Sequence, residues 1–138
     1  MAILQKLKEH FSRDSVTLDL QDIQALILRS RPEPYVGVHA MLHFDEAAGA
    51  RNLLGRLAPH IASADNWSED LDFWIGAALS FEGLKALGVP DAQLKTFPLP
   101  FQQGMAARAE QLRDFGPNAP ENWEDVFKPG NCHLALTI

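Results

Sequence analysis

The sequence predicts an α+β protein, with an antiparallel sheet and helices on one face, that forms the first part of a ferredoxin-like fold and is apparently incomplete. Segments 35–44, 72–79 and 131–138 alternate between apolar and mixed residues, which is typical of strands that bury one face. Segments 46–58, 81–87 and 100–113 carry apolar residues at helical spacing. The 138 residues suit one domain and are too few for two ordinary ones.

Composition restricts the class of protein. Hydrophobic residues make up 46% of the chain and charged residues 22%, which excludes wholesale disorder. The net charge of −6 argues against nucleic-acid binding. A lone cysteine, Cys132, excludes an internal disulfide framework. With no apolar run of about 20 residues and no leader-like apolar stretch, we expect no membrane contact and a cytoplasmic location.

The chain divides into an N-terminal helix and arm, 1–34, and the front part of a ferredoxin-like domain, 35–138. Residues 1–13 place four apolar side chains on one helical face, which we expect to dock on the body of the protein. A membrane-surface or partner-binding helix is the alternative. The dense apolar run 18–30 fits either a strand or a buried irregular arm, and Pro32 and Pro34 end it.

The domain begins with a strand and a helix. In 35–44 one face is wholly apolar, and Asp45 then suits the N-cap of a helix over 46–58, which Pro59 ends. After the strand 72–79, Ser80 can cap the helix 81–87, and Gly88 suits the position that follows its C-terminus. Pro100 suits the first turn of a helix over 100–113. We expect a loop over 115–130 before the strand 131–138.

This order predicts the topology of the sheet. A right-handed crossover makes the first two strands parallel, and the third strand can enter between them, antiparallel to both. We expect helices 46–58 and 100–113 to bury one face, comprising Val36, Val38, Leu42, Phe73, Ile75, Leu79, Leu134 and Leu136. A complete unit would need another helix and a fourth strand. We therefore expect the front piece of something longer, or completion by a partner, with a homo-oligomer or a complementary C-terminal domain covering the mixed face of Tyr35, Gly37, His39, Met41 and His43.

Few residues carry a chemical signature, and the common nucleotide, zinc and nucleophile motifs are absent. Cys132 and His133 are strand neighbours that point to opposite faces, so we expect no dyad and a small buried residue at Cys132. His39 and His43 share a face but lie about 13 Å apart, too far to share one metal ion. His133 could approach one of them. We expect these rings where the sheet meets another domain or subunit; the rim of a cofactor pocket is the alternative.

We expect structural roles, and no catalytic or metal-binding role, for the tryptophans and for the acidic stretch before the second strand. We expect Trp67, Trp74 and Trp123 to fill volume in the packing. An acidic stretch before the second strand fits a solvated loop and lacks the calcium-loop pattern; it comprises Asp65, Glu69, Asp70 and Asp72. From the residues alone, no catalytic residue and no metal site can be named, and any cofactor-binding residue stays unknown.

Several short stretches together resemble one family. They are Asp22-Ile23-Gln24 with Ile27-Leu28-Arg29, then His43-Phe44, Leu53–Pro59, Ala78–Pro90, Phe97–Leu112 and Pro120–Glu124. In their order and spacing they resemble the N-terminal domain portion of dye-decolorising (DyP-type) haem peroxidases. The resemblance covers roughly residues 18–138.

The resemblance implies two ferredoxin-like domains packed as an α+β barrel, with haem b in the complete family protein and peroxide-dependent oxidation of dyes or phenols. The family's proximal histidine, GxxDG motif and distal arginine lie downstream of the matched region, and none of the five histidines here corresponds to the haem ligand. It therefore implies a portion or subunit that is inactive alone, with no cofactor expected on this chain. A non-catalytic α+β-barrel binding or oligomerisation module is the alternative, and a small cofactor-free oxygenase is a third.

Overall fold

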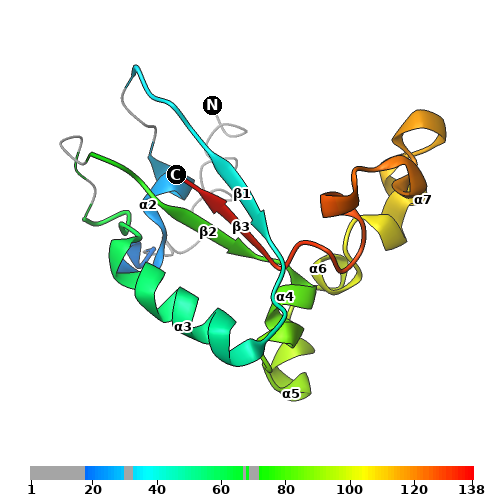
Figure 1. Cartoon of the computed structure of the whole chain (residues 1–138), viewed down its shortest axis with the longest axis horizontal. Coiled ribbons are helices and arrows are strands. Elements are labelled where there is room, and N and C mark those ends of the chain that lie inside the picture. The colour runs from blue at the N-terminus through cyan, green and yellow to red at the C-terminus, as the bar shows by residue number, and fades with distance from the viewer. Residues whose placement is uncertain (1–17, 30–32, 67, 69–71) are drawn as a thin grey trace, which may run out of the picture.

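The computed structural model describes residues 18–29, 33–66, 68 and 72–138 (Figure 1). The helix expected over 1–13 lies outside the described residues. The strands are β1 (His39–Leu42), β2 (Gly76–Leu79) and β3 (Leu134–Thr137). The α-helices are α2 (Ala25–Leu28), α3 (Ala47–Leu57), α4 (Phe81–Ala86), α5 (Asp91–Leu94), α6 (Leu99–Gln103) and α7 (Ala109–Leu112). Short 3-10 turns are η1 (Leu20–Asp22), η2 (Ala58–His60), η3 (Ala106–Arg108), η4 (Gly116–Asn118), η5 (Pro120–Asn122) and η6 (Asp125–Phe127).

The predicted strand order is confirmed within the described residues. The sheet runs β1-β3-β2, and β3 is antiparallel to both neighbours, with Ala40 and Ala77 on either side of Leu136. The strands are shorter than predicted, four residues each, although Val38 and Ile138 extend the β1–β3 ladder by exchanging backbone hydrogen bonds of 2.8 and 2.9 Å. An α+β fold is therefore present, while the complete ferredoxin-like unit stays a prediction.

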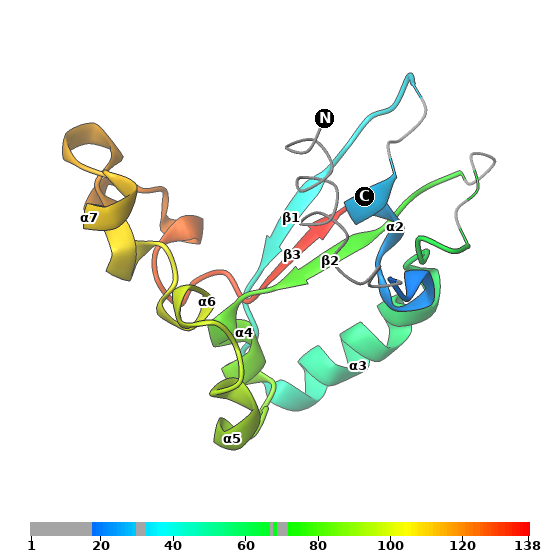
Figure 2. The same ribbon diagram turned by 180° about the vertical axis from the view of Figure 1, so that it is seen from behind.

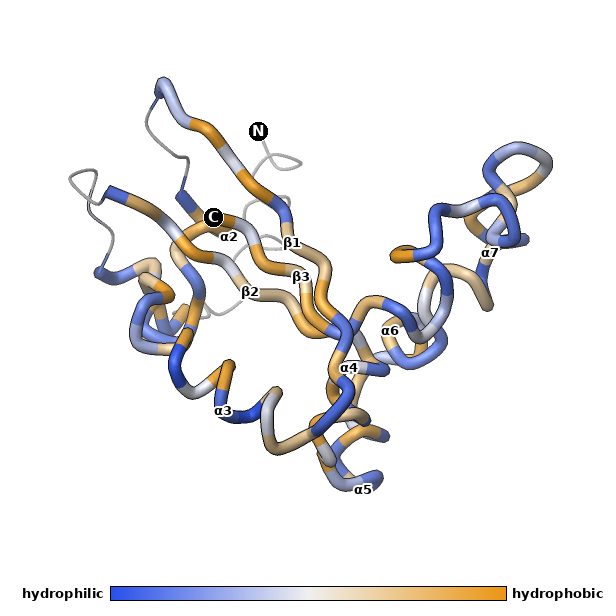
Figure 3. The backbone as a smooth tube through the Cα atoms, viewed as in Figure 1, coloured by the Kyte–Doolittle hydropathy of each residue, from blue (hydrophilic) through white to orange (hydrophobic). Residues whose placement is uncertain are grey.

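The core lies between one face of the sheet and α3, as the alternation predicted. Leu134, fully buried, and Leu136 form its centre together with Phe44 and Ala50. Half-buried apolar side chains complete it, namely Ala40, Leu42, Leu53, Leu54, Leu57, Ala77, Leu79, Ala86 and Leu87. Figure 2 shows α3 running along one side of the sheet, and Figure 3 shows hydrophobic residues recurring along the strands.

Three of the predicted core residues are not buried. Val36 is 93% exposed, Val38 57% and Phe73 52%, so their expected burial is wrong. Helix α3, which covers this face of the sheet, is too short to reach these residues. It has 11 residues and spans only about 16 Å. It covers the centre of the sheet and leaves the segments that lead into β1 and β2 bare.

The predicted helix over 100–113 is also wrong. It is broken into α6, η3 and α7, because Gly104 adopts φ +70° directly after α6. The segment extends away from the end of the sheet and does not cover its apolar face (Figure 1). The second helical contribution to the core comes instead from the end of α4.

The predicted helix ends are mostly confirmed. Ser80 caps α4, since its Oγ accepts a 2.9 Å hydrogen bond from Gly83 N–H, and Gly88 follows the helix with φ +81°. Helix α3 ends at Leu57, two residues before Pro59. The cap predicted at Asp45 is wrong, because Glu46 occupies that position without a side-chain hydrogen bond.

Over the described residues 18–29, the N-terminal arm forms short helical turns and not a strand. It contains η1 and α2, and its residue Ala25 is only 2% exposed. The Gln24 side chain pairs with the backbone of β2: its Nε2 donates to Ala77 O at 2.7 Å, and its Oε1 accepts from Ala77 N–H at 2.9 Å. The amide thereby imitates a neighbouring strand along the outer edge of β2. Within the described residues, no helix is both long and apolar enough to cross a membrane.

Candidate functional site

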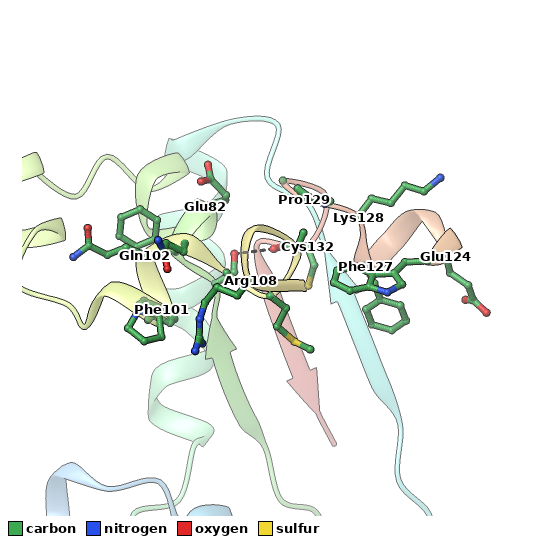
Figure 4. A pocket seen from close by; sticks show the side chains of 18 residues that line it. Glu82, Phe101, Gln102, Arg108, Glu124, Phe127, Lys128, Pro129 and Cys132 are labelled. Atoms are coloured by element: carbon green, nitrogen blue, oxygen red, sulfur yellow. Dashed lines mark hydrogen bonds between the residues drawn. The ribbon is translucent and has the colours of Figure 1, made fainter. Parts of the chain in front are cut away.

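A cavity of about 850 Å³ opens where the β2–α4 corner meets the α6–η3 segment and the loop 123–132 (Figure 4). Its wall is largely aromatic and sulfur-bearing, with Phe81, Phe101, Met105, Trp123, Phe127 and Cys132. Its charged members are Glu82, Arg108, Glu124 and Lys128. An apolar hollow of this volume with few polar groups is the usual form of a small-molecule site.

Ring contacts and backbone hydrogen bonds hold the aromatic wall. Phe81 and Phe101 meet edge to face with centroids 5.9 Å apart, and Phe97 backs Phe101 at 5.3 Å. The indole Nε1 of Trp123 donates to Asn118 O at 2.8 Å, which fixes the ring against its own loop. The half-buried position of Trp123 agrees with the packing role expected of it.

Two of the four charged side chains are already paired. Glu82 contacts Lys85 at 2.9 Å and Lys128 contacts Asp125 at 2.7 Å, and the hydrogen bond from Lys128 lowers the pKa of Asp125. Glu124 points away from the other labelled side chains in Figure 4. Arg108 donates through Nε to Gln111 Oε1 at 3.1 Å, and the described residues offer its terminal guanidinium nitrogens no hydrogen bond. Arg108 is thus the charge best placed to meet a ligand.

Cys132 lies half-buried on the cavity wall and forms no dyad with its neighbour. Its Sγ contacts Met41 Sδ at 3.8 Å, while Ser80 Oγ donates to Cys132 O at 2.7 Å. The adjacent His133 instead accepts the Phe44 N–H through Nδ1 at 2.9 Å. Both residues precede β3, which begins at Leu134, so the alternation expected of strand neighbours does not apply to them.

The histidines meet as a pair outside the cavity. His133 stacks on His43 with ring centroids 4.1 Å apart, so His133 does approach one of the two histidines of the predicted strand 35–44. His43 Nδ1 contacts Asn131 O at 3.1 Å, and His39 Nδ1 contacts Thr137 Oγ1 at 3.0 Å. Burial, and secondarily the neighbouring His43, lower the pKa of His133, against weaker opposing effects of Glu82 and Asp45.

These residues do not fit a histidine-ligated haem. No histidine lines the cavity, and His133 is only 7% exposed. In the part of the chain that the structure describes, no group of three or more His, Cys, Asp or Glu side chains is arranged to hold a metal ion.

The sequence predicted the histidine neighbourhood but missed the cavity. A signal was present in the recurrence of phenylalanine at Phe81, Phe97 and Phe101, but only Phe101 lies in the helix expected over 100–113, where it was placed on the apolar face. Asp65 and Asp72 are exposed, as expected for a solvated acidic loop. Trp74 is half-buried, whereas Trp67, Glu69 and Asp70 lie outside the described residues.

Comparison with known proteins finds a solved structure with a similar fold. The sequence matches no protein-family model and no curated protein. Among solved structures, one described as an ancestral D-type dye decolorizing peroxidase is 26% identical, with a TM-score of 0.68. The match covers 87% of this chain and 27% of that one. The chain thus shares its α+β fold with part of a dye-decolorizing peroxidase, in agreement with the resemblance of its short motifs.

Proposed function

We propose that this chain is a non-catalytic portion or subunit of a DyP-type haem peroxidase, forming part of its barrel wall. The observation that carries the proposal is the 26% identical structural match, which covers 87% of this chain and 27% of the peroxidase. The complete assembly would bind haem b and use hydrogen peroxide to oxidise dyes or phenols. This portion would supply architecture and no reacting group.

The state of the histidines supports an inactive role for the chain alone. A haem ligand needs a free imidazole nitrogen facing an open pocket. None of His39, His43 and His133 lines the large cavity, and His133 is buried. Haem b therefore belongs, on this proposal, to the residues that complete the assembly.

The face of the sheet opposite α3 supports the need for a partner. His39, His43 and Ala78 are exposed there, and Met41 and Ala135 are half-buried. Their apolar surface would gain from being covered by another layer. We propose that a complementary domain or a second copy of the chain covers this face.

Haem titration tests the inactive role. Adding haem to the purified chain should give no saturable Soret change at one equivalent, and the spectrum should stay that of free haem. His60→Ala removes an exposed histidine of η2 and serves as the matched control for His43→Ala. Stoichiometric binding that His43→Ala abolishes and His60→Ala retains would overturn the proposal.

The aromatic cavity favours a second candidate, a binding module for aromatic anions. Arg108, whose terminal guanidinium nitrogens have no hydrogen-bond partner among the described residues, lines the same cavity as Phe101 and Met105, which suits a planar ligand with a carboxylate or sulfonate. Anilinonaphthalene sulfonate is a practical fluorescent probe. Arg108→Gln should weaken its binding about tenfold, as loss of one charge-assisted contact implies, whereas Arg113→Gln, outside the cavity, should not. Equal affinity in all three proteins would exclude this candidate.

A further inference from the structure

His133 joins three parts of the chain around the core. Its backbone N–H donates to Leu42 O at 2.8 Å, which connects the end of β1 to the start of β3. Its carbonyl oxygen accepts from Ser80 N–H at 3.1 Å, at the residue that caps α4. Its side chain, only 7% exposed, accepts the Phe44 N–H through Nδ1 at 2.9 Å. Of these three hydrogen bonds, only the last depends on the protonation state of the imidazole.

The Phe44 hydrogen bond lies where the chain passes from β1 into α3. The Phe44 side chain packs with Ala50 and Leu134 in the core, and its ring lies 5.3 Å from that of His133. Glu46, the residue before α3, makes no side-chain capping hydrogen bond. A second cavity of about 400 Å³ lies at this corner, lined by residues from the end of β1 and from α3. The bond to His133 therefore ties the start of α3 to the sheet beside an existing hollow.

The stacked rings of His43 and His133 use their Nδ1 atoms in opposite ways. His43 Nδ1 faces the carbonyl oxygen of Asn131 at 3.1 Å, an acceptor, so this nitrogen carries the proton. A backbone N–H faces Nδ1 of His133, so this nitrogen is bare and the neutral ring is the Nε2–H tautomer. Protonation of His43 leaves its hydrogen bond intact, whereas protonation of His133 at Nδ1 removes the acceptor of the Phe44 N–H.

The surroundings of His133 oppose its charged form. Burial lowers its pKa below the ordinary 6.5, and the neighbouring His43 lowers it further. Glu82 of α4 and Asp45 before α3 act in the opposite direction, as does a hydrogen bond with the Gly130 backbone. An arrangement in which the imidazole reaches water would restore its ordinary pKa. Acid therefore favours such an arrangement over the closed one.

We propose that His133 is an acid-operated latch that holds Phe44 and the start of α3 against the sheet. Protonation at Nδ1 breaks the bond to the Phe44 N–H and places a charge against the neighbouring imidazole, so the segment 43–46 swings away and enlarges the adjoining cavity. β1 stays paired with β3, because the hydrogen bonds between Val38 and Ile138 join backbone atoms that do not titrate. The opening is local, differs from global unfolding and does not depend on the peroxidase relationship.

Nuclear magnetic resonance of the unmodified chain tests the latch. At neutral pH, His133 should be the Nε2–H tautomer and His43 the Nδ1–H tautomer. As pH falls below 6.5, hydrogen exchange at the Phe44 amide should accelerate relative to the Val38 and Ile138 amides. The limit is about tenfold per pH unit for an opening linked to one proton. The Phe44 amide and the His133 ring should titrate with the same midpoint, while the two ladder amides stay protected.

Three variants separate the latch from the other histidines. His133→Asn keeps an acceptor that does not titrate, so the acceleration at Phe44 should disappear. His43→Gln should reduce it without abolishing it, since burial is the larger cause of the lowered pKa of His133. His60→Ala, at an exposed position of η2, should leave it unchanged.

The same spectra of the unmodified chain can overturn the proposal even if a variant fails to fold. A Phe44 amide whose relative exchange does not change with pH would do so. A proton on Nδ1 of His133 at neutral pH would do so as well, because the Phe44 N–H would then have no acceptor there. Simultaneous loss of protection at Phe44, Val38 and Ile138 would show global unfolding in place of a local opening.

Discussion

Replacing Gly83 by alanine should destabilise the protein through one defined contact. Gly83 lies buried in the first turn of α4, where the helix packs on the backbone entering β3. A Cβ built there would overlap the carbonyl oxygen of His133 and lie 2.9 Å from its carbonyl carbon. Both are backbone atoms, so no side-chain rotation can relieve the overlap.

The expected magnitude follows from two opposing effects. Overpacking of a close contact costs about 1–3 kcal/mol, and a rigid backbone neighbour places Gly83→Ala at the upper end. Alanine also gains about 1 kcal/mol over glycine in helix propensity. The separation cannot widen freely, because Ser80 N–H donates to His133 O at 3.1 Å. We therefore expect a net loss of about 2 kcal/mol in the free energy of unfolding.

Urea denaturation followed by circular dichroism measures this loss. Gly55→Ala is the matched control, since Gly55 lies inside α3 and its added Cβ would have nothing within 4 Å. That variant should gain about 0.5–1 kcal/mol. If Gly83→Ala were as stable as the unmodified chain, the close approach of α4 to β3 would be wrong.

Three further variants probe the arm, the helix cap and the buried histidine. Gln24→Ala should cost about 1–3 kcal/mol in urea denaturation by leaving two backbone groups of Ala77 without partners; an unchanged midpoint would contradict the edge-closing role. Ser80→Ala should cost about 1 kcal/mol, and an intact midpoint would refute the cap. Because the pKa of His133 is lowered from 6.5, the unfolded chain takes up its proton first, so stability should fall as pH drops through about 6.5 and level off below the native pKa. His133→Asn, which keeps an acceptor but does not titrate, should flatten this dependence, whose slope is at most about 1.4 kcal/mol per pH unit for one proton; an unaltered slope would exclude His133 as its source.

Alternation along the strands was sufficient to predict which sheet face is buried. It placed Leu42, Leu79, Leu134 and Leu136 correctly against the helical layer, and connectivity then predicted β3 between β1 and β2. Alternation could not predict how far the covering helix extends. Val36 follows the pattern perfectly and is 93% exposed, because burial depends on what lies opposite.

The structure that follows α5 was harder to predict, because the backbone changes direction at one residue, Gly104. Helical spacing across 100–113 is real, but Gly104 adopts a positive φ, which a periodicity argument does not detect. Phe101 and Met105, which lie on either side of this break, both line the cavity. The contact between Gln24 and Ala77 was likewise not predictable, since a side-chain amide that replaces a strand has no periodic signature.

The central claim is that the chain contributes structure and no reaction centre to a DyP-type peroxidase. The most direct measurement is peroxide-dependent oxidation of an anthraquinone dye by the purified chain with equimolar haem, compared with the same haem alone. The account predicts equal initial rates in the two samples. A rate that rises in proportion to the protein, saturates at one haem per chain and is lost on substitution of a single histidine would contradict it.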